Sequence, residues 1–585
     1  MQGLRALKKW VPIAQWLPQY EKSSLKGDFS AGLTVAVMLI PQGMAYSVLA
    51  GLPPVYGLYA SIIPLIIYAI FGTSKQLAVG PVAMVGLIVF AGVSEFATPG
   101  SAEFIQLAIL AALGVGIVQA LMGFMRMGFL VNFLSHPVLS GFTSAAAIII
   151  GVSQLKGLLG IDMPGSLTVI ETVSMAITKI ESANVFTAIV GIGSVVLILA
   201  LKKWKRAFPS ALAVVFLGTI AVVIFGLNDL GVRIVGEVPK GFPAFLTPSV
   251  NVDDLTKLLP MILVISLVGY MESIAIAKAI ANRKKYKIDS NQELIGLGFA
   301  NIVGSFFQSF PVTGGLSRTA VNDQAGAETP LAAILTAILI ALTVAFLTPL
   351  FYYLPTSVLA AIIIVAVSSL FDFNAMKHLW NTDKRDLVLL SVTFLTTLFL
   401  GIEDGIAFGV ILSLVIVIYN STKPHVAELG QLEDSDNYRN IERYKNAKIH
   451  DDVLVFRYDS PLYFASCNYF LDASQKLIRK RGTMHKLFVL DASSINFLDS
   501  TGVHTLEELL KYLSSNGIEF SIAGAIGPVR DMLKKSGIMT HIGVNRFYFD
   551  VAEAVYDFRM LNTPSTRDSD IKTSAKFNAA QSNYL

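Results

Sequence analysis

Apolar and polar positions divide the chain into two regions. From about residue 28 to residue 420 the chain alternates between apolar segments and short polar loops, whereas ordinary soluble sequence follows. We count fourteen apolar segments, most of them near the ~20 residues that span a bilayer. They cover roughly 30–50, 55–71, 78–93, 104–124, 129–152, 184–201, 208–226, 258–280, 292–309, 313–325, 330–348, 353–371, 386–400 and 404–420. The pattern predicts a helical membrane domain over 28–420, preceded by a cytoplasmic N-terminal segment over 1–27.

The third and tenth segments are too short to span a membrane, and each begins with small residues. They contain LAVGPVAMV at 77–85 and PVTGGLSRTAV at 311–321, and each is third in a series of seven. Short segments interrupted by Gly or Pro at matching positions of two halves indicate a transporter's substrate site near the membrane midplane. Because seven is an odd number, the two halves would insert in opposite orientations. We therefore predict a 7+7 inverted repeat that contains two half-helices.

The loops show a strong charge asymmetry. About eighteen Lys and Arg residues lie in the N-terminal segment and in loops after even-numbered segments, whereas about five lie on the other side. Cytoplasmic loops carry the excess of Lys and Arg in membrane proteins. The asymmetry supports the count of fourteen and predicts that both termini are cytoplasmic.

The region after residue 420 has the pattern of a small α/β domain. A polar linker is expected over 421–450, a domain over 451–558 and a disordered tail over 559–585. Strands are expected at 453–458, 463–465, 487–491 and 520–523, and helices at 466–479, 503–514 and 528–536. This alternation of strands and helices predicts a parallel or mixed sheet.

Composition narrows the class of protein further. Only 15% of the 585 residues are charged and 54% are hydrophobic, against about 25% charged in soluble proteins. The net charge of +4 is small, and no basic patch with aromatic residues suggests nucleic acid. The single cysteine, Cys467, excludes an intrachain disulfide. No His, Cys and carboxylate side chains are spaced as metal ligands, so neither a metal nor another cofactor is expected.

The tenth segment has the chemistry of an anion site. A helix N-terminus presents unpaired N–H groups and the positive end of the helix dipole to an anion. Gly314 and Gly315 would let the backbone approach such a ligand closely. The Ser317 hydroxyl could donate to an oxyanion, and Arg318 adds a full charge. Arg318 could instead extend toward the membrane surface from a helix end, although the Gly-Gly-Leu-Ser run before it favours the site.

The third segment offers a second helix N-terminus of the same kind. Pro81 suits the first turn of a helix because its missing N–H costs nothing there. Gln42 and Tyr46, on the first segment, could wall the same site or could serve helix packing, and both roles stay open. The expected substrate-binding residues are Gln42, Tyr46, Gly80, Pro81, Val82, Ala83, Gly314, Gly315, Leu316, Ser317 and Arg318.

Two further candidates carry acidic or hydroxyl groups. Glu272 lies inside an apolar segment, where a carboxylate can carry a proton or can simply neutralise Arg318. In the small domain, Ser500 and Thr501 lie where a strand leads into a helix. They could accept a phosphoryl group, but an ordinary helix cap formed by this Asp-Ser-Thr-Gly run is the more frequent explanation.

These residues together resemble the SulP (sulfate permease) anion transporter family. The similar stretches in the membrane domain are DFSAGLTVAVMLIPQGMAYSVLAGLPPVYGLYAS, LAVGPVAMVGL, MESIAIAKAIA and NIVGSFFQSFPVTGGLSRTAVNDQAGAETPL. The small domain resembles a STAS domain through LFVLDASSINFLDSTGVHTLEEL. The resemblance implies a core and a gate subdomain, a homodimer, elevator-like movement of the core, and an anion between the third and tenth helices.

Residue roles carry over where the motifs match. Ser317 and Arg318 match the family's anion-binding positions, 80–83 match the N-terminus of the third helix, and Gln42 and Tyr46 match pocket positions. Glu272 matches an acidic residue linked to cation coupling, and MESIAIAKAIA resembles the branch that couples sulfate to protons. Sodium-coupled bicarbonate relatives tend to have a further acidic residue downstream in this helix, whereas this chain has Lys278 nearby. This difference argues against sodium coupling without excluding it.

We therefore expect a multi-pass protein of a bacterial inner (plasma) membrane that takes up sulfate by proton symport, and not an enzyme. Bicarbonate, chloride exchange or a dicarboxylate would use the same helix dipoles. A channel, or a sensor in which the STAS domain signals, would also fit the pattern, whereas Arg318 and the STAS domain argue against a nucleobase carrier of similar fold. The expected partners are the anion, the proton, the lipid bilayer, a second copy of the chain and a cytoplasmic protein that binds the STAS domain.

Overall fold

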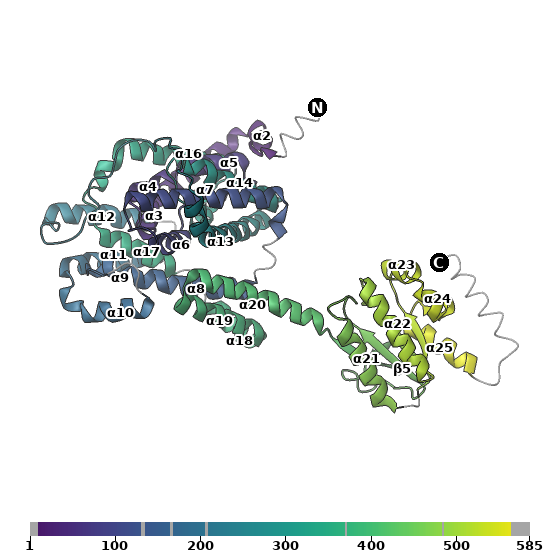
Figure 1. The fold of residues 1–585 in the computed structure, drawn as a ribbon. Helices are drawn as coiled ribbons and strands as arrows, with labels where there is room; N and C mark the ends of the chain where they lie inside the picture. The colour runs from purple at the N-terminus through teal and green to yellow at the C-terminus, as the bar shows by residue number, and fades with distance from the viewer. Residues whose placement is uncertain are drawn as a thin grey trace. The chain divides into compact units, whose positions relative to one another are not determined.

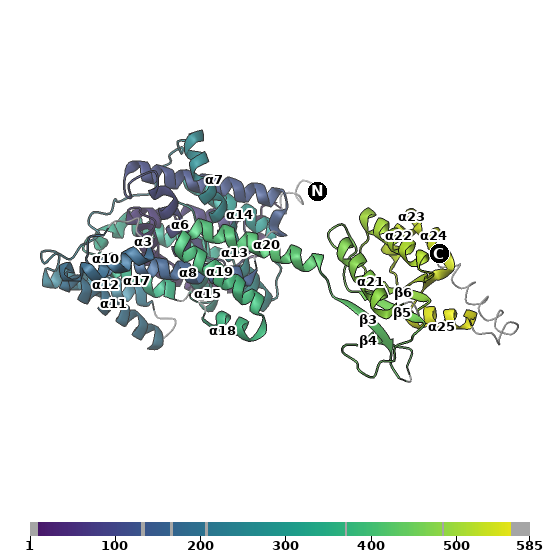
Figure 2. The ribbon, with the colours of Figure 1, turned by 60° about the horizontal axis from the view of Figure 1, so that its bottom comes forward.

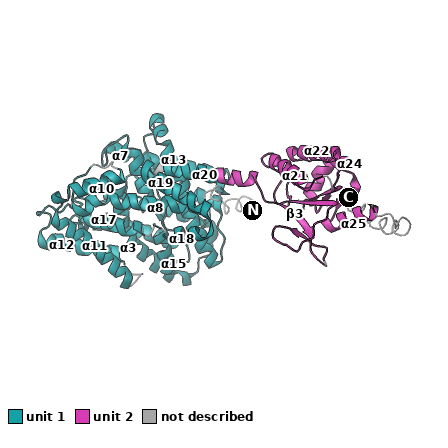
Figure 3. Ribbon diagram, turned by 90° about the horizontal axis from the view of Figure 1, so that it is seen from below, with its two compact units in different colours: residues 1–413 teal, residues 414–585 magenta. Residues whose placement is uncertain are grey.

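The computed structural model describes residues 10–129, 135–163, 168–204, 209–368, 371, 373–433, 435–482 and 485–562. The chain divides into two compact units, Met1–Ser413 and Leu414–Leu585 (Figure 3). Unit 1 is helical, and unit 2 contains a six-stranded sheet. Most of the expected tail, 563–585, lies outside the described residues.

Each of the fourteen apolar segments contains a helix (Figures 1 and 2). The first seven are α3 (Leu25–Leu49), α4 with α5 (Pro54–Tyr59, Ile63–Phe71), α6 (Ala83–Ser94), α7 (Ala102–Phe124), α8 (His136–Ser153), α11 (Val185–Trp204) and α12 (Ser210–Phe225). The second seven are α13 (Val252–Lys284), α14 (Ser290–Ser305), α15 (Leu316–Gln324), α16 (Leu331–Leu342), α17 (Thr356–Val367), α19 (Lys384–Leu400) and α20 (Ile402–Thr422). Within the described residues, eight helical stretches are long and apolar enough to cross a membrane.

Shorter elements connect these helices, and the hydrophobic pattern does not predict them. Before α3 come α2 (Ile13–Trp16), η1 (Leu17–Gln19) and η2 (Lys22–Ser24). Between α8 and α11 lie α9 (Leu155–Leu159), α10 (Val169–Thr178) and η4 (Ile180–Ser182). Helix α16 continues into a π-helix, η5 (Thr343–Leu347), and a 3-10 turn, η6 (Thr348–Phe351), and α18 (Phe373–Thr382) precedes α19.

Each of the two half-helices follows one strand of a short antiparallel pair. Strand β1 (Val79–Gly80) pairs antiparallel with β2 (Thr313–Gly314), with Val79 opposite Gly314 and Gly80 opposite Thr313. Helix α6 follows β1 and α15 follows β2, with 12 and 9 residues respectively, or about 18 and 14 Å at 1.5 Å per residue. Antiparallel pairing is the relation that an inverted repeat requires of its two halves.

The helices of unit 1 pack in two groups. The core group consists of α3–α7 and α13–α16, in which α14 packs along α5 and α7, and α3 packs on α4, α15 and α16. The gate group contains α8, α9, α11, α12, α17 and α19, with α8 and α19 side by side in Figures 1 and 2. The groups meet where α3 contacts α12 and α17, and where α6 contacts α8 and α17. Helices α3 and α6, which carry candidate site residues, therefore also border the gate group.

Unit 2 is a mixed sheet covered by helices. The strand order is β4-β3-β5-β6-β7-β8, with β5 to β8 parallel and β3 antiparallel to both neighbours. The strands are β3 (Val426–Gln431), β4 (Tyr438–Asn440), β5 (Val453–Tyr458), β6 (Leu487–Asp491), β7 (Glu519–Ala523) and β8 (Phe547–Tyr548). The helices are α21 (Cys467–Arg481), α22 (Ser500–Ser515), α23 (Gly527–Lys535), α24 (Ile538–Ile542) and α25 (Val551–Asn562), with η9 (Val544–Arg546) before β8.

Three expectations for the small domain are wrong. The expected linker, 421–450, contains β3 and β4, which are hydrogen-bonded into the sheet. The expected strand at 463–465 is a turn, because the Ser466 hydroxyl and Asp499 carboxylate accept the N–H groups of Tyr463 and Phe464. The last helix runs to Asn562, so residues 559–562 belong to the domain and not to a disordered tail.

Candidate functional site

The N-termini of α6 and α15 meet at the strand pair and carry no capping side chain. Val82 is the N-cap of α6 and Gly315 is the N-cap of α15, and neither helix receives a side-chain cap. Both starts are tied together by the N–H of Gly315, which donates to the carbonyl oxygen of Ala78 at 3.1 Å. Within the described part of the chain, no side chain caps the first N–H groups of either helix, so these groups can bind an anion.

Arg318 is buried between these two starts. Its side chain is only 2% exposed, and Nη1 donates to the carbonyl oxygen of Pro81 at 2.6 Å. Nε and Nη2 are buried and have no hydrogen-bond partner in the described part of the chain. The guanidinium thus reaches toward α6 and not to the membrane surface, so the interpretation of Arg318 as a surface-reaching arginine is wrong.

Glycines make room for this arginine. A Cβ built on Gly315 would lie 2.7 Å from both Cζ and Nη2 of Arg318. Gly80 has a φ of +154°, and a Cβ there would lie 3.6 Å from Nη2. The guanidinium therefore packs against the bare backbone of Gly315, where any side chain would displace it.

The remaining expected binding residues lie in the two segments that contain the helix starts. Gly80, Val82, Ala83 and Gly314 are buried, whereas Leu316 and Ser317 are exposed in the first turn of α15. Pro81 precedes the N-cap of α6 and is not in its first turn. Its position matters for another reason, since the Pro81 carbonyl accepts the hydrogen bond from Arg318.

Tyr46 on α3 and Glu272 on α13 approach the site, and Gln42 lies one turn before Tyr46 on α3. Gln42 is buried and its Oε1 has no hydrogen-bond partner among the described residues. Tyr46, Glu272 and Arg318 lie close enough to interact electrostatically with one another. Glu272 Oε2 is buried without a hydrogen-bond partner in the described chain. Because Nη1 of Arg318 donates to Pro81 and its other two nitrogens have no partner among the described residues, no hydrogen bond joins Arg318 to Glu272 there.

A second layer of polar residues, which the sequence pattern does not reveal, holds the strand β2. The hydroxyl of Ser273 lies 2.7 Å from that of Thr313 and accepts the N–H of Gly314 at 2.8 Å. Asn301 bonds both the N–H and the carbonyl oxygen of Val312. These residues fix the entry to α15, and their only sequence signal is a small polar residue inside an apolar helix.

Two buried carboxylates anchor the loops beside the half-helices, and the sequence pattern does not reveal these either. Glu293 accepts hydrogen bonds from the Tyr68 hydroxyl, from the N–H and hydroxyl of Thr73, and from the N–H of Ser74. Asp28 accepts the N–H groups of Glu328 and Thr329 and the Thr329 hydroxyl. The first loop leads into β1 and the second follows α15.

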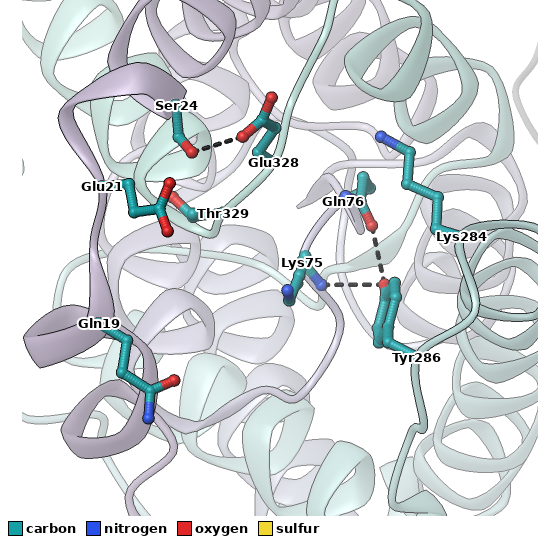
Figure 4. Close-up of a pocket in the computed structure, with 9 residues that line it drawn as sticks. All are labelled: Gln19, Glu21, Ser24, Lys75, Gln76, Lys284, Tyr286, Glu328 and Thr329. Atoms are coloured by element: carbon teal, nitrogen blue, oxygen red, sulfur yellow. Dashed lines mark hydrogen bonds between the residues drawn. The ribbon is translucent and has the colours of Figure 1, made fainter.

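A polar pocket of about 390 Å³ lies between these anchored loops (Figure 4). In it the Tyr286 hydroxyl accepts the backbone N–H of Lys75 and donates to Gln76 Oε1. The lining residues are Gln19, Glu21, Ser24, Lys75, Gln76, Lys284, Tyr286, Glu328 and Thr329. None of the expected substrate-binding residues lines this pocket, so it is distinct from the candidate anion site.

In unit 2, the run Asp499-Ser500-Thr501-Gly502 forms a helix cap. Asp499 is the N-cap of α22, and its carboxylate accepts the N–H of Gly502 at 2.7 Å. Ser500 and Thr501 are exposed in the first turn of that helix. The capping explanation is confirmed, and the two hydroxyls are accessible to modifying enzymes.

Comparisons with known proteins agree with this architecture. The Sulfate permease family matches residues 25–393 and the STAS domain matches residues 444–554. "Probable sulfate transporter 4.2" from Arabidopsis thaliana is 38% identical over 98% of this chain and 88% of its own length. "Sulfate transporter 4.1, chloroplastic" from the same plant is 39% identical over 94% of this chain and 83% of its own length.

A solved structure extends the comparison to three dimensions. The murine Solute Carrier 26 family member A9 anion transporter, in the inward-facing state, superposes with a TM-score of 0.88 at 28% identity, covering 95% of each chain. The match therefore includes both units. The chain belongs to the sulfate permease family of multi-pass membrane anion transporters and carries a C-terminal STAS domain.

Proposed function

We propose that this protein takes up sulfate together with protons by moving its core group past its gate group. The observation that carries the proposal is the guanidinium of Arg318, buried between two uncapped helix N-termini with Nε and Nη2 unpaired in the described structure. Leaving such a charge without a partner is costly. A doubly charged oxyanion bound there would supply that partner.

Sulfate suits this arrangement of donors. Nε and Nη2 form one edge of the guanidinium plane, and such an edge bonds two oxygens of an oxyanion in parallel. The N–H groups at the starts of α6 and α15 and the hydroxyl of the exposed Ser317 are donors for the remaining oxygens. The curated relatives at 38% and 39% identity bear the name of sulfate transporters, which supports the same substrate.

Glu272 is our candidate for the proton carrier. Its carboxyl group lies within electrostatic reach of Arg318 but keeps one oxygen unpaired in the described chain. Moving a dianion inward against an inside-negative potential costs about 4.6 kcal/mol per 100 mV at ~2.3 kcal/mol per charge. Concentrative uptake therefore requires more than two protons per sulfate or a steep pH gradient.

The contact between the two helix groups suits a sliding movement. The buried residues of α6 are all apolar, and those of α17 are apolar apart from Ser357. Because such faces contain few hydrogen bonds to break, the core group can move as a body and expose the site to each side in turn. We further propose a homodimer in the plasma membrane with both termini in the cytoplasm, where the STAS domain meets a regulatory protein.

Uptake into proteoliposomes tests the substrate. Purified protein is reconstituted and labelled sulfate uptake is measured alone and in the presence of excess unlabelled sulfate, bicarbonate, chloride or a dicarboxylate, beside the variant Arg318→Gln. We expect saturable uptake that sulfate inhibits best and that Arg318→Gln abolishes. Uptake of another anion with no sulfate signal would contradict the substrate, and normal uptake by Arg318→Gln would contradict the site.

A further inference from the structure

We propose that Thr319 and Asn322 are positioning residues that lock the backbone before α6 onto α15, so that both helix N-termini and Arg318 face one anion. The proposal rests on the proposed function only because the affinity for a bound anion is used to measure how well these donors are positioned. Neither residue is expected to touch the anion.

Thr319 makes the central connection. Its side chain is fully buried, and its hydroxyl accepts the N–H of Ala78 at 3.0 Å and donates to the carbonyl oxygen of Gly315 at 2.7 Å. The same carbonyl also accepts the N–H of Thr319 at 2.9 Å. The hydroxyl therefore joins the segment that enters α6 to the N-cap of α15, and the Ala78 N–H depends on it.

Three side chains of α15 hold the segment 76–81 in register. Asn322 Nδ2 donates to the carbonyl oxygen of Gln76 at 2.8 Å, Thr319 holds Ala78, and Arg318 Nη1 donates to the carbonyl oxygen of Pro81 at 2.6 Å. Arg318 and Thr319 are adjacent, and Asn322 lies about one turn later on the same short helix. All three bonds go to backbone atoms. Together they fix where α6 begins relative to α15.

The consequence concerns Arg318 directly. Its Nη1 bond to Pro81 orients the guanidinium edge formed by Nε and Nη2. If the segment 76–81 shifts, this bond is lost or redirected, and the donors of the two helices no longer converge. Such a displacement of the donors weakens anion binding even when every donor is still present.

The test compares Thr319→Val with Thr319→Ser. Valine keeps the shape but leaves the buried N–H of Ala78 without an acceptor, whereas serine keeps the hydroxyl. Thr336→Val is the matched control, since Thr336 is also buried and its hydroxyl joins α3 to α16 through the carbonyl oxygens of Gly32 and Ala332. For each variant we measure sulfate binding to the purified protein, the KM and maximal rate of uptake, and thermal stability.

We expect Thr319→Val to raise the sulfate Kd and KM about tenfold, because the displaced donors bind the anion less tightly, with a maximal rate close to that of the parent. Thr319→Ser should stay within about twofold of the parent, and Thr336→Val should change thermal stability but not KM. Equal KM values for Thr319→Val and the parent would overturn the proposal. Equal impairment of Thr319→Val and Thr319→Ser would also overturn it, because the hydroxyl would then not be the cause.

A second variant covers the case in which Thr319→Val does not fold. Asn322→Ala removes the bond to Gln76, and the same rise in KM is expected, whereas an unchanged KM would overturn the proposal. If the parent protein transports another anion and no sulfate, the proposed substrate is wrong. The positioning roles are then decided by the same comparison with that anion.

Discussion

The guanidinium of Arg318 donates one hydrogen bond, from Nη1 to Pro81, and keeps the edge formed by Nε and Nη2 unpaired within the described structure. At the scale of single residues, we propose that this edge distinguishes an oxyanion from a spherical anion. An arginine edge bonds two oxygens at a fixed spacing, whereas an ammonium acts as a point charge. On this proposal, the site selects an anion by its shape as well as by its charge.

Replacing Arg318 by lysine tests this distinction. We expect Arg318→Lys to weaken sulfate binding about 10- to 100-fold, since one or more charge-assisted hydrogen bonds worth about 1.5–3 kcal/mol are lost. Chloride should compete more effectively in the variant than in the parent. Inhibition of labelled sulfate uptake by chloride measures the change, and an unaltered ratio of the two affinities would argue against recognition by the edge.

Gly315 provides a second test at this scale. Gly315→Ala should abolish high-affinity uptake, because the new Cβ would lie 2.7 Å from the Cζ of Arg318 and would push the side chain aside. Gly193→Ala on α11 is the control, since a Cβ there meets nothing within 4 Å. Uptake is measured for both after the amount of folded protein is matched. If Gly315→Ala transports like Gly193→Ala, the guanidinium does not need this position.

Charge made some of these residues recognisable from the sequence, whereas others gave no such signal. Arg318 and Glu272 stand out because ionisable groups are expensive inside a membrane. Thr319 and Asn322 do not, because a Thr or Asn in a short polar helix carries no indication of its partner. Their bonds reach 241 and 246 positions along the chain, and only the folded backbone brings those positions together.

At the scale of elements, the half-helices depend on anchored loops. The carboxylate of Glu293, on α14, accepts four hydrogen bonds from Tyr68, Thr73 and Ser74. Three of them come from the loop that leads into β1. This one side chain therefore connects α14 and α5 with the entry to the first half-helix.

Removing this anchor should destabilise the core group. Glu293→Ala leaves four donors without their acceptor, and we expect a loss of about 3 kcal/mol or more of folding stability. Thermal unfolding of the detergent-purified protein measures the effect. Glu103→Ala, at the exposed first turn of α7, is the control and should leave the unfolding temperature unchanged. A similar unfolding temperature for both variants would show that the anchor is dispensable.

An ion cluster in unit 2 predicts a pH dependence. Asp459 pairs with Arg457 Nε at 2.7 Å and with His425 Nδ1 at 2.8 Å. Burial opposes the carboxylate form, but hydrogen bonds from Arg457 and His425 outweigh it and lower the pKa of Asp459. The folded state thus holds this proton less tightly than the unfolded chain. Its contribution to stability is present above the ordinary pKa of 3.8 and is lost as the pH falls toward the lowered value.

Replacing the carboxylate should flatten this dependence. Between about pH 5 and pH 3, thermal stability should fall less steeply for Asp459→Asn than for the parent. Asp472→Asn, on α21, is the control and should follow the parent. Parallel curves for all three proteins would mean that this cluster does not contribute.

The elements were predictable where hydrophobicity alone decides them. Each of the fourteen apolar segments contains a helix, because a run of apolar residues near bilayer length has few other solutions. The strands β3 and β4 were missed because polar residues interrupt them. They contain only a few buried apolar residues, among them Ala427 and Leu429. The segment 463–465 was expected to be a strand but forms a turn, because its N–H groups donate to Ser466 and Asp499. Such side-chain acceptors do not alter the hydrophobic pattern.

At the scale of the whole molecule, two halves in opposite orientations bring two helix N-termini to one point. The family and the fold follow from the sequence and the comparisons. Glu272 lies beside the candidate site and keeps one oxygen unpaired in the described chain, and we propose that it sets the direction and energy source of transport. Proton coupling through this residue is the central claim of the proposed function.

The most direct test is labelled sulfate accumulation in proteoliposomes with an imposed inward proton gradient, for the parent and for Glu272→Gln. We predict that the parent concentrates sulfate above the external level and that dissipating the gradient prevents this. Glu272→Gln should still bind sulfate and exchange it across the membrane, but should not concentrate it. Accumulation by the variant equal to that of the parent, or accumulation by the parent without a gradient, would contradict the account.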